Sequence, residues 1–283
     1  MTTTPPPGVY PGIPETEYRS WSAVNASSLK LLERSPAHYR FARDNPKSDD
    51  DTDALLVGRM AHMAMFQPDL MDEQVRVWTP PINPKTGKPY GPDTNAAALD
   101  RAAFTDMHRG KIIVAESQMA VASAVAAAAR ANPEIRALLE LPGTPEVSIV
   151  WDDEDTGLRC QGRIDWLAKG LLLDLKTCEV ASNRAVSAMA MRYGYFTQMA
   201  FYTDGLAQLY KRQHEAWIIA VEKEPPHGMG RYRVHELGIE WGRKAYKAAL
   251  SVIAECEASG VWPGYADGEL TPPESAIREL NDE

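Results

Sequence analysis

Residues 162–178 read Gly-Arg-Ile-Asp-Trp-Leu-Ala-Lys-Gly-Leu-Leu-Leu-Asp-Leu-Lys-Thr-Cys, and this stretch decides the fold. Its composition on either side of Lys169-Gly170 predicts two strands, Leu158–Ala168 and Leu171–Cys178. Lys169-Gly170 has the length of a tight hairpin loop. We therefore expect two adjacent antiparallel strands whose register is set by this loop.

The register of this hairpin brings three charged residues together. If Lys169-Gly170 is a two-residue loop, Asp165 lies directly opposite Asp174, with Cβ atoms about 4.5–5.5 Å apart. Side chains alternate faces along a strand, so Lys176 shares the face of Asp174. Two such like charges destabilise the fold unless a divalent cation compensates, and carboxylate oxygens favour Mg²⁺ or Mn²⁺. Lys176 is then placed to activate a water or to stabilise charge on a phosphate.

A surface hairpin with ordinary cross-strand ion pairs is the alternative interpretation of these residues. The run Leu171-Leu-Leu-Asp-Leu-Lys-Thr177 is largely apolar, which predicts that its charges are buried. Buried charges are costly without a partner or a metal, so the run favours a functional site. The preceding strand, predicted at Glu146–Trp151, adds a third carboxylate, because Glu146 would fall close to Arg163 on the face of Asp165.

The rest of the chain predicts one mixed α/β domain. Helices, a three-strand meander, further helices, strands and a closing helix follow one another, which favours a mixed central β-sheet flanked by helices. We expect residues 1–24 to form an extended N-terminal arm, 25–265 a single domain and 266–283 a polar C-terminal tail. A long loop rich in Pro and Gly is predicted at 79–95. Apolar spacing or helix-forming composition predicts helices at 54–66, 116–131, 195–210 and 241–256.

Composition limits the function classes. The chain has 283 residues, of which 44% are hydrophobic, and this is enough to bury one sizeable core. No apolar run approaches the roughly 20 residues of a membrane span, and the N-terminus lacks the features of a signal peptide. We therefore expect a cytoplasmic protein without membrane contact. The three cysteines, Cys160, Cys178 and Cys256, are widely spaced, which indicates reduced thiols and argues against a zinc ribbon.

The formal net charge of −9 counts against nucleic-acid binding by the chain as a whole. Affinity for phosphates depends on a local basic patch and not on the total charge. Acidic residues that bind a metal ion also contribute negative charge until the cation is present. The net charge therefore leaves a metal-dependent enzyme acting on nucleic acid open.

Five motifs occur in an order that resembles a known group of nucleases. Gly58-Arg-Met-Ala-His62 is followed by Glu146, Asp165, Asp174-Leu-Lys176 and Gln198-Met-Ala-Phe-Tyr202. This order is similar to that of the RecB-like branch of the PD-(D/E)xK nucleases. Over nearly the whole chain, the sequence resembles the nuclease domain of the RecE-type exonucleases (exodeoxyribonuclease VIII). The Pro of the family motif is replaced here by Ile164.

The resemblance implies a PD-(D/E)xK restriction-endonuclease-like core and a DNA exonuclease. Such an enzyme degrades linear double-stranded DNA from 5′ ends and leaves 3′ single strands for recombination. Mg²⁺ or Mn²⁺ is the expected cofactor, with two ions per site. A ring-shaped tetramer, a single-strand annealing partner of the RecT type and phage or prophage origin are also implied. The metal ligands implied are His62, Asp165, Asp174 and the Leu175 carbonyl, with Lys176 as the catalytic lysine and Glu146 and Gln198 as supporting catalytic residues.

A second group of residues could bind DNA or a terminal 5′ phosphate. A helix start at Asn25-Ala-Ser27-Ser28 could bind a phosphate, with charge added by Arg19 and Lys30. A plain N-cap with a solvated basic face is the alternative. Tyr202, one turn after Gln198, could contact DNA or belong to the core.

Two other functions remain open at this stage. One is an endonuclease of the same fold. The other is a DNA-binding recombination accessory that kept the fold and lost the chemistry.

Overall fold

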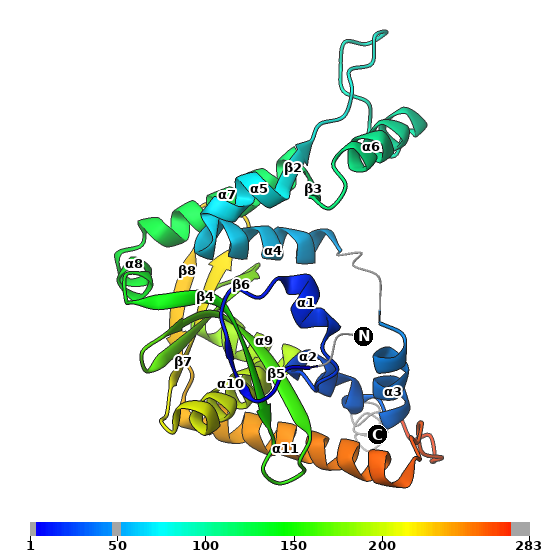
Figure 1. Cartoon of the computed structure of the whole chain (residues 1–283). Helices are drawn as coiled ribbons and strands as arrows, with labels where there is room; N and C mark the ends of the chain where they lie inside the picture. Colours follow the sequence, from blue (N-terminus) through cyan, green and yellow to red (C-terminus); the bar gives the residue numbers. More distant parts are fainter. Residues whose placement is uncertain (1–3, 47–51, 273–283) are drawn as a thin grey trace, which may run out of the picture.

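A computed structural model describes residues 4–46 and 52–272, and its centre is a six-stranded β-sheet (Figure 1). In sheet order the strands are β1 (Gly8–Tyr10), β4 (Gly143–Asp152), β5 (Arg159–Ala168), β6 (Leu171–Cys178), β7 (Glu215–Glu222) and β8 (Met229–Arg233). β6 and β7 pair in parallel, and the other neighbouring pairs of this sheet are antiparallel. The predicted mixed sheet is therefore confirmed.

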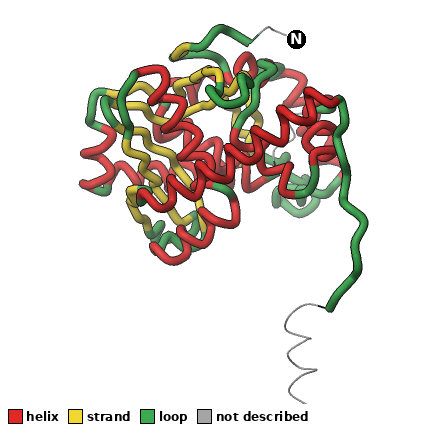
Figure 2. The backbone as a smooth tube through the Cα atoms, turned by 90° about the horizontal axis from the view of Figure 1, so that it is seen from below, coloured by secondary structure: helices red, strands yellow, loops and turns green. Residues whose placement is uncertain are grey.

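Helices cover both faces of the sheet (Figures 1 and 2). They are α1 (Glu15–Ser20), α2 (Ala26–Leu29), the 3-10 helix η1 (Lys30–Glu33), α3 (Pro36–Asp44), α4 (Asp53–Phe66), α5 (Pro68–Gln74), α6 (Asn95–Met107), α7 (Glu116–Ala131), α8 (Pro133–Leu139), α9 (Asn183–Tyr193), α10 (Tyr195–Tyr210) and α11 (Glu236–Ser259). α10 and α11 pack on one face, and α4, α7 and α8 pack on the other. The expected α/β architecture is thus confirmed. Among the described residues, we find no helix with the length and apolarity needed to cross a lipid bilayer.

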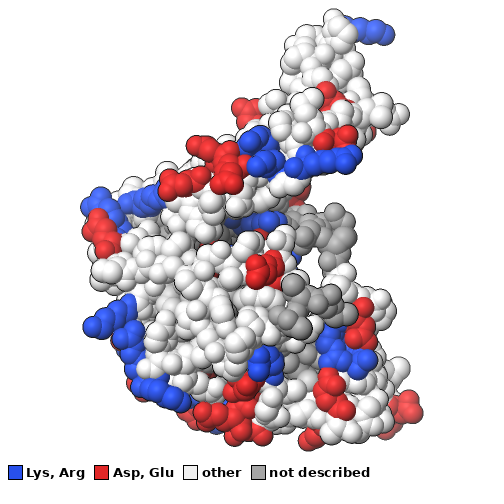
Figure 3. Space-filling view, viewed as in Figure 1, with Lys and Arg blue, Asp and Glu red and all other residues white. Residues whose placement is uncertain are grey.

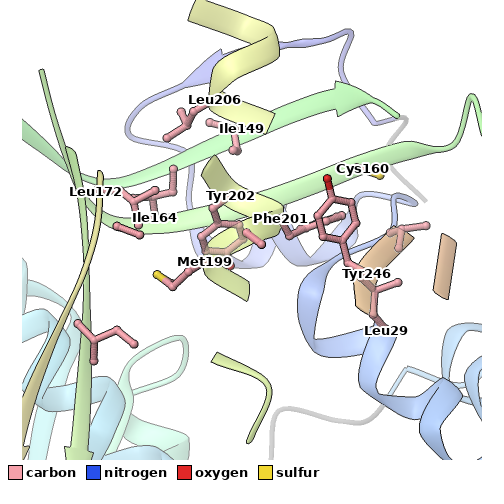
Figure 4. Packing of buried hydrophobic residues seen from close by; sticks show 14 of the residues in the cluster. Leu29, Ile149, Cys160, Ile164, Leu172, Met199, Phe201, Tyr202, Leu206 and Tyr246 are labelled. Atoms are coloured by element: carbon pink, nitrogen blue, oxygen red, sulfur yellow. The ribbon is translucent and has the colours of Figure 1, made fainter. Parts of the chain in front are cut away.

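Two hydrophobic cores, one on each face, hold the helices to the sheet. On the α10 face, Phe201 and Tyr202 belong to a cluster with Ile164 of β5 (Figure 4). On the α4 face, Met60 belongs to a cluster with Leu175 of β6. Because β6 contributes alternate residues to the two cores, it is buried on both sides, which explains its nearly continuous apolar sequence.

A small peripheral unit projects from the α4 and α7 side (Figure 1). It consists of α6 and of two parallel strands, β2 (Val75–Trp78) and β3 (Ile112–Ala115). Residues 79–94 connect β2 to α6 and contain an isolated bridge between Ile82 and Pro89. The long loop predicted at 79–95 is therefore confirmed, whereas the strands and helix around it were not predicted.

The N-terminal segment differs from the predicted extended arm. Its residues 8–10 form β1, which pairs antiparallel with β4 at the edge of the sheet, and α1 follows. Aromatic contacts between Trp21 and both Tyr10 and Tyr18 stabilise this folded conformation, which explains the difference. Residues 1–3 of the arm and 273–283 of the predicted tail lie outside the described residues, and the domain limits themselves stay a prediction.

Two helical glycines give a test of the packing. Gly242 of α11 lies against α10, where an added Cβ atom would lie 2.1 Å from the backbone oxygen of Phe196. Gly58 of α4 is a matched control, because its added Cβ atom would lie 3.5 Å from Thr177 Oγ1, an ordinary contact. We expect Gly242→Ala to lower the free energy of unfolding by about 1–3 kcal/mol, since the two backbones must separate.

We expect Gly58→Ala to leave the free energy of unfolding unchanged or to raise it by up to about 1 kcal/mol, because alanine is the better helix former. Urea denaturation of both variants checks this difference in sign. Equal effects at the two positions would contradict the close contact between α10 and α11.

Candidate functional site

The candidate site lies where β5 and β6 part. The pairs nearest the hairpin match the predicted register, and the ladder ends at Trp166 and Leu173. The next pair, Asp165 with Asp174, does not form, because Asp165 Oδ2 accepts a hydrogen bond of 2.7 Å from the backbone nitrogen of Leu175. The prediction that the two aspartates pair directly across the ladder is therefore wrong. The side chain of one aspartate occupies the place of a backbone acceptor.

A second irregularity lies on the other side of β5. In the ladder between β4 and β5, Pro145 pairs with Trp166 and Val147 pairs with Ile164 in the same register. Glu146 and Asp165, which lie between these pairs, do not pair. Glu146 has a φ of 50°, in the left-handed region that non-glycine residues rarely adopt. Ile164 and Leu167 of β5, three residues apart, belong to the same core, so strand alternation breaks between them. Such irregularities redirect side chains, here at the two carboxylates of the site.

His62 of α4 completes a cluster with these two carboxylates. One ligand atom each of His62, Glu146 and Asp165 lies within 4.8 Å of the others. His62 Nδ1 lies 3.2 Å from Asp165 Oδ2, and His62 Nε2 lies 2.8 Å from the Leu175 carbonyl oxygen. Both contacts fix the ring of His62 between α4 and β6.

Asp174 and Lys176 form a neighbouring group on β6, and Gln198 of α10 bridges them. Lys176 Nζ lies 2.6 Å from Asp174 Oδ2 and donates to Gln198 Oε1 at 3.2 Å. Gln198 Nε2 donates to Asp174 Oδ1 at 3.0 Å. The ammonium of Lys176 also lies 4.7 Å from the ring centroid of Tyr195. The predicted common face of Asp174 and Lys176 is confirmed by these contacts.

The charges of the site shift one another's pKa. Burial, followed by the Asp165 carboxylate, raises the pKa of Glu146, and burial raises the pKa of Asp174. Burial also opposes the charge of Asp165, but His62, Lys176 and the Leu175 backbone N–H together outweigh it and lower the pKa of that carboxyl. Burial lowers the pKa of His62, but Asp165 and Glu146 outweigh this effect and raise it to about 9. Burial likewise disfavours charge on Lys176, but Asp174 and Asp165 raise its pKa, so this side chain is a cation.

The donor set fits a hard divalent cation. Burial, and to a smaller extent the charge of Asp165, raises the pKa of Glu146 and of Asp174, and a bound divalent cation would favour the charged form of both carboxylates. Carboxylate oxygens favour Mg²⁺ or Mn²⁺. The structure groups Glu146 with His62 and Asp165, whereas the resemblance implied Asp174 in that set. Direct metal ligation by Asp174 and by the Leu175 carbonyl stays a prediction.

The residues predicted to bind DNA or a 5′ phosphate are not brought together as one site. Asn25 is the N-cap of α2, and the hydroxyl of Ser28 completes a capping box through hydrogen bonds with the backbone of Asn25. Arg19 forms an ion pair with Glu15, and Lys30 donates to a backbone carbonyl at 2.7 Å. Ser27 is exposed at the start of the short helix α2.

Tyr202 lies in the core and not on a surface. Its side chain packs beside Gly162, where an added Cβ atom would lie 2.6 Å from the ring. Its hydroxyl lies 3.4 Å from Gln198 Nε2. The alternative that assigned Tyr202 to the core is the one that this position supports.

The predicted proximity of Glu146 and Arg163 is confirmed, whereas sequence reasoning missed two residues that contact the site, Tyr18 and Tyr195. Arg163 binds Glu146 at 2.7 Å, Tyr18 lies under the Arg163 guanidinium, and Tyr195 faces Lys176. The spacing of Tyr195 three residues before Gln198 was a usable signal for that residue. Tyr18 gave no such signal, because its contact depends on the fold of the N-terminal segment.

Known structures with a similar backbone support the fold. A crystal structure described as "Putative exonuclease" from Eubacterium rectale matches with a TM-score of 0.63 and 14% identity, covering 94% of this chain and 97% of that chain. An alkaline exonuclease from Laribacter hongkongensis, with a TM-score of 0.29 and 14% identity over 84% of this chain and 93% of that chain, is too distant to support an argument. No curated protein matches the chain.

The family assignment rests on the sequence itself. Residues 25–269 match the model of the family described as "PDDEXK-like domain of unknown function (DUF3799)". This range contains His62, Glu146, Asp165, Asp174, Lys176 and Gln198, and the PD-(D/E)xK resemblance is thereby confirmed. The chain therefore belongs to this family of PDDEXK-like domains.

Proposed function

We propose that this protein is a metal-dependent DNA exonuclease that hydrolyses phosphodiester bonds of linear double-stranded DNA. One observation carries the proposal. The Asp174–Lys176 pair, bridged by Gln198, lies beside the cluster of His62, Glu146 and Asp165 at the point where β5 and β6 part. This arrangement combines a cation site with a separate protein cation, which are the two requirements for stabilising negative charge on a phosphate.

The proposed chemistry divides the work between the two groups. A bound divalent cation supplies a Lewis acid for the phosphate and for the leaving oxygen. His62, Glu146 and Asp165 would hold it. The raised pKa of Lys176, opposed by burial and caused by Asp174 and Asp165, favours an electrostatic role for its ammonium group over a role as a general base. Gln198 orients both Lys176 and Asp174.

The finer parts of the proposal come from the RecE-type resemblance. For the reaction, they are 5′→3′ degradation, 3′ single-stranded products for recombination, and two Mg²⁺ or Mn²⁺ ions per site. For the protein, they are a ring tetramer, a RecT-type annealing partner, a cytoplasmic location and a phage or prophage origin. The description of the Eubacterium rectale protein as an exonuclease supports the exonuclease over the endonuclease. On the face of the described residues that Figure 3 shows, Lys and Arg alternate with Asp and Glu without a continuous basic band.

The first test is cleavage of end-labelled linear duplex and of closed circular DNA, with Mg²⁺ or with EDTA. We expect Mg²⁺-dependent loss of the linear duplex from its 5′ ends and intact circles, because an exonuclease requires an end. Asp174→Ala is expected to abolish cleavage, since it removes the partner of Lys176 and Gln198. Its thermal denaturation profile checks that the fold persists.

The other outcomes decide between the alternatives. Cutting of closed circles would replace the exonuclease with an endonuclease of the same fold. DNA binding without cleavage, in Mg²⁺ and in Mn²⁺, would identify an inactive accessory protein. Loss from 3′ ends would contradict the proposed polarity and leave the nuclease assignment intact.

Lys176 and Lys169 form a matched pair for the second test. Both lysines belong to the β5–β6 hairpin, but Lys169 is exposed in its loop. We expect Lys176→Met to slow cleavage at least about 100-fold, because charge stabilisation at the phosphate is lost. Lys169→Met is expected to cleave at the wild-type rate. The measurement is single-turnover cleavage of a labelled duplex, and similar rates for both variants would remove Lys176 from the mechanism.

A further inference from the structure

Arg163 lies beside the cluster of His62, Glu146 and Asp165, which we call the metal cluster, and three polar contacts hold its side chain in place. Its Nε donates to Glu146 Oε2 at 2.7 Å, and its Nη1 donates to the Ile13 carbonyl oxygen at 2.9 Å and to Ser148 Oγ at 3.2 Å. The side chains of Arg163 and Glu146 are each 16% exposed. A guanidinium with partners in several directions has little freedom to rotate, so the position of the Glu146 carboxylate is fixed with it.

The N-terminal segment supplies part of this support. Besides the Ile13 carbonyl, the ring of Tyr18 lies under the guanidinium, with 5.7 Å between the ring centroid and the Arg163 carbon Cζ. From the same segment, Glu15 forms an ion pair of 3.1 Å with Arg59, which lies one helical turn before His62 on α4. Residues 13–18 therefore contact Arg163, the partner of Glu146, and Arg59, one turn from His62, although they precede the range matched by the family model.

We propose that Arg163 is a positioning residue for Glu146, and that residues 13–18 hold Arg163, so that the N-terminal segment is a working part of the metal site. The inference rests on the proposed function in one respect, namely that Glu146 binds a divalent cation. Glu146 lies at a φ of 50°, outside the ordinary strand geometry, so its own strand does not hold it in a regular position. Arg163 supplies the missing constraint.

A competing effect predicts the opposite sign. Arg163 neutralises Glu146, so a divalent cation must share that carboxylate with a guanidinium. If competition dominated, removal of the arginine would strengthen metal binding. If positioning dominates, removal weakens it, because partners of metal ligands contribute about 10–100-fold in metal affinity. Metal affinity therefore separates the two effects.

The test is Mn²⁺ binding to the full chain, measured by isothermal titration calorimetry with MnCl₂ and without DNA. We expect Arg163→Met to weaken binding at least about 10-fold. Arg163→Lys is expected to restore little, because an ammonium cannot reproduce the several directed donors of a guanidinium. Glu146→Gln should weaken binding as well, and the double variant Arg163→Met/Glu146→Gln should bind no more weakly than Glu146→Gln alone.

Arg159 is the matched control for Arg163. It lies four residues earlier on β5, pairs with Asp152 of β4 and donates to the Pro5 carbonyl oxygen of the same N-terminal segment at 2.7 Å. Asp152 is not part of the metal cluster. We expect Arg159→Met to keep wild-type Mn²⁺ affinity, and thermal denaturation of both arginine variants checks that they fold.

Tyr18→Leu extends the test to the N-terminal segment. It keeps an apolar side chain and removes the ring under the guanidinium, so we expect a several-fold loss of Mn²⁺ affinity without loss of folding. Unchanged or tighter Mn²⁺ binding by folded Arg163→Met would overturn the proposal, as would an additive loss in the double variant. Because the readout does not involve cleavage, Mn²⁺ binding by a wild-type protein that cuts no DNA would refute the proposed function and leave the positioning role standing.

Discussion

The hydrogen bond from the Leu175 backbone to the Asp165 carboxylate is the interaction on which the site depends. A regular antiparallel ladder would pair backbone with backbone and would hold β5 and β6 together along their whole length. Here a side chain takes one of those places, and the strands part. At this point His62 reaches the Leu175 carbonyl from α4, and Gln198 reaches Asp174 from α10. One substituted hydrogen bond thereby opens the sheet to both helical layers.

The two layers contribute different chemistry because β6 is buried on both sides. Residues of β6 alternate between the two cores, and its polar residues lie at the end where the strand leaves β5. A ligand-type cluster with His62 therefore forms toward α4, and an ion pair with Lys176 forms toward α10. Burial strengthens both groups, since charges in a less polar environment interact more strongly and cannot be left unpaired.

The sequence contained the hairpin and much of the site, but not the irregularities that assemble it. The short loop at Lys169-Gly170 was sufficient to predict the register up to Trp166 and Leu173, and the motif order identified His62 and Gln198. Alternation then placed Asp165 opposite Asp174, and this was wrong, because a strict period of two cannot describe a side chain that replaces a backbone acceptor. The contacts of the N-terminal segment could not be predicted from the sequence either, because the Ile13 carbonyl accepts a hydrogen bond from Arg163, 150 residues further along the chain.

The glycines around α10 have a consequence for the accuracy of the site. Gly162 of β5 lies against the ring of Tyr202 on α10, and Gly205 of α10 lies against the ring of Trp151 on β4. Gly242 of α11 lies against the α10 backbone at Phe196. A glycine has no side chain that could change its rotamer to accommodate a displacement of α10. These three close contacts therefore fix the position of α10 along its axis, and with it how far Gln198 reaches toward Asp174 and Lys176. From Tyr195 to Leu209 no residue of α10 is exposed, so the helix has no free side toward which it could shift.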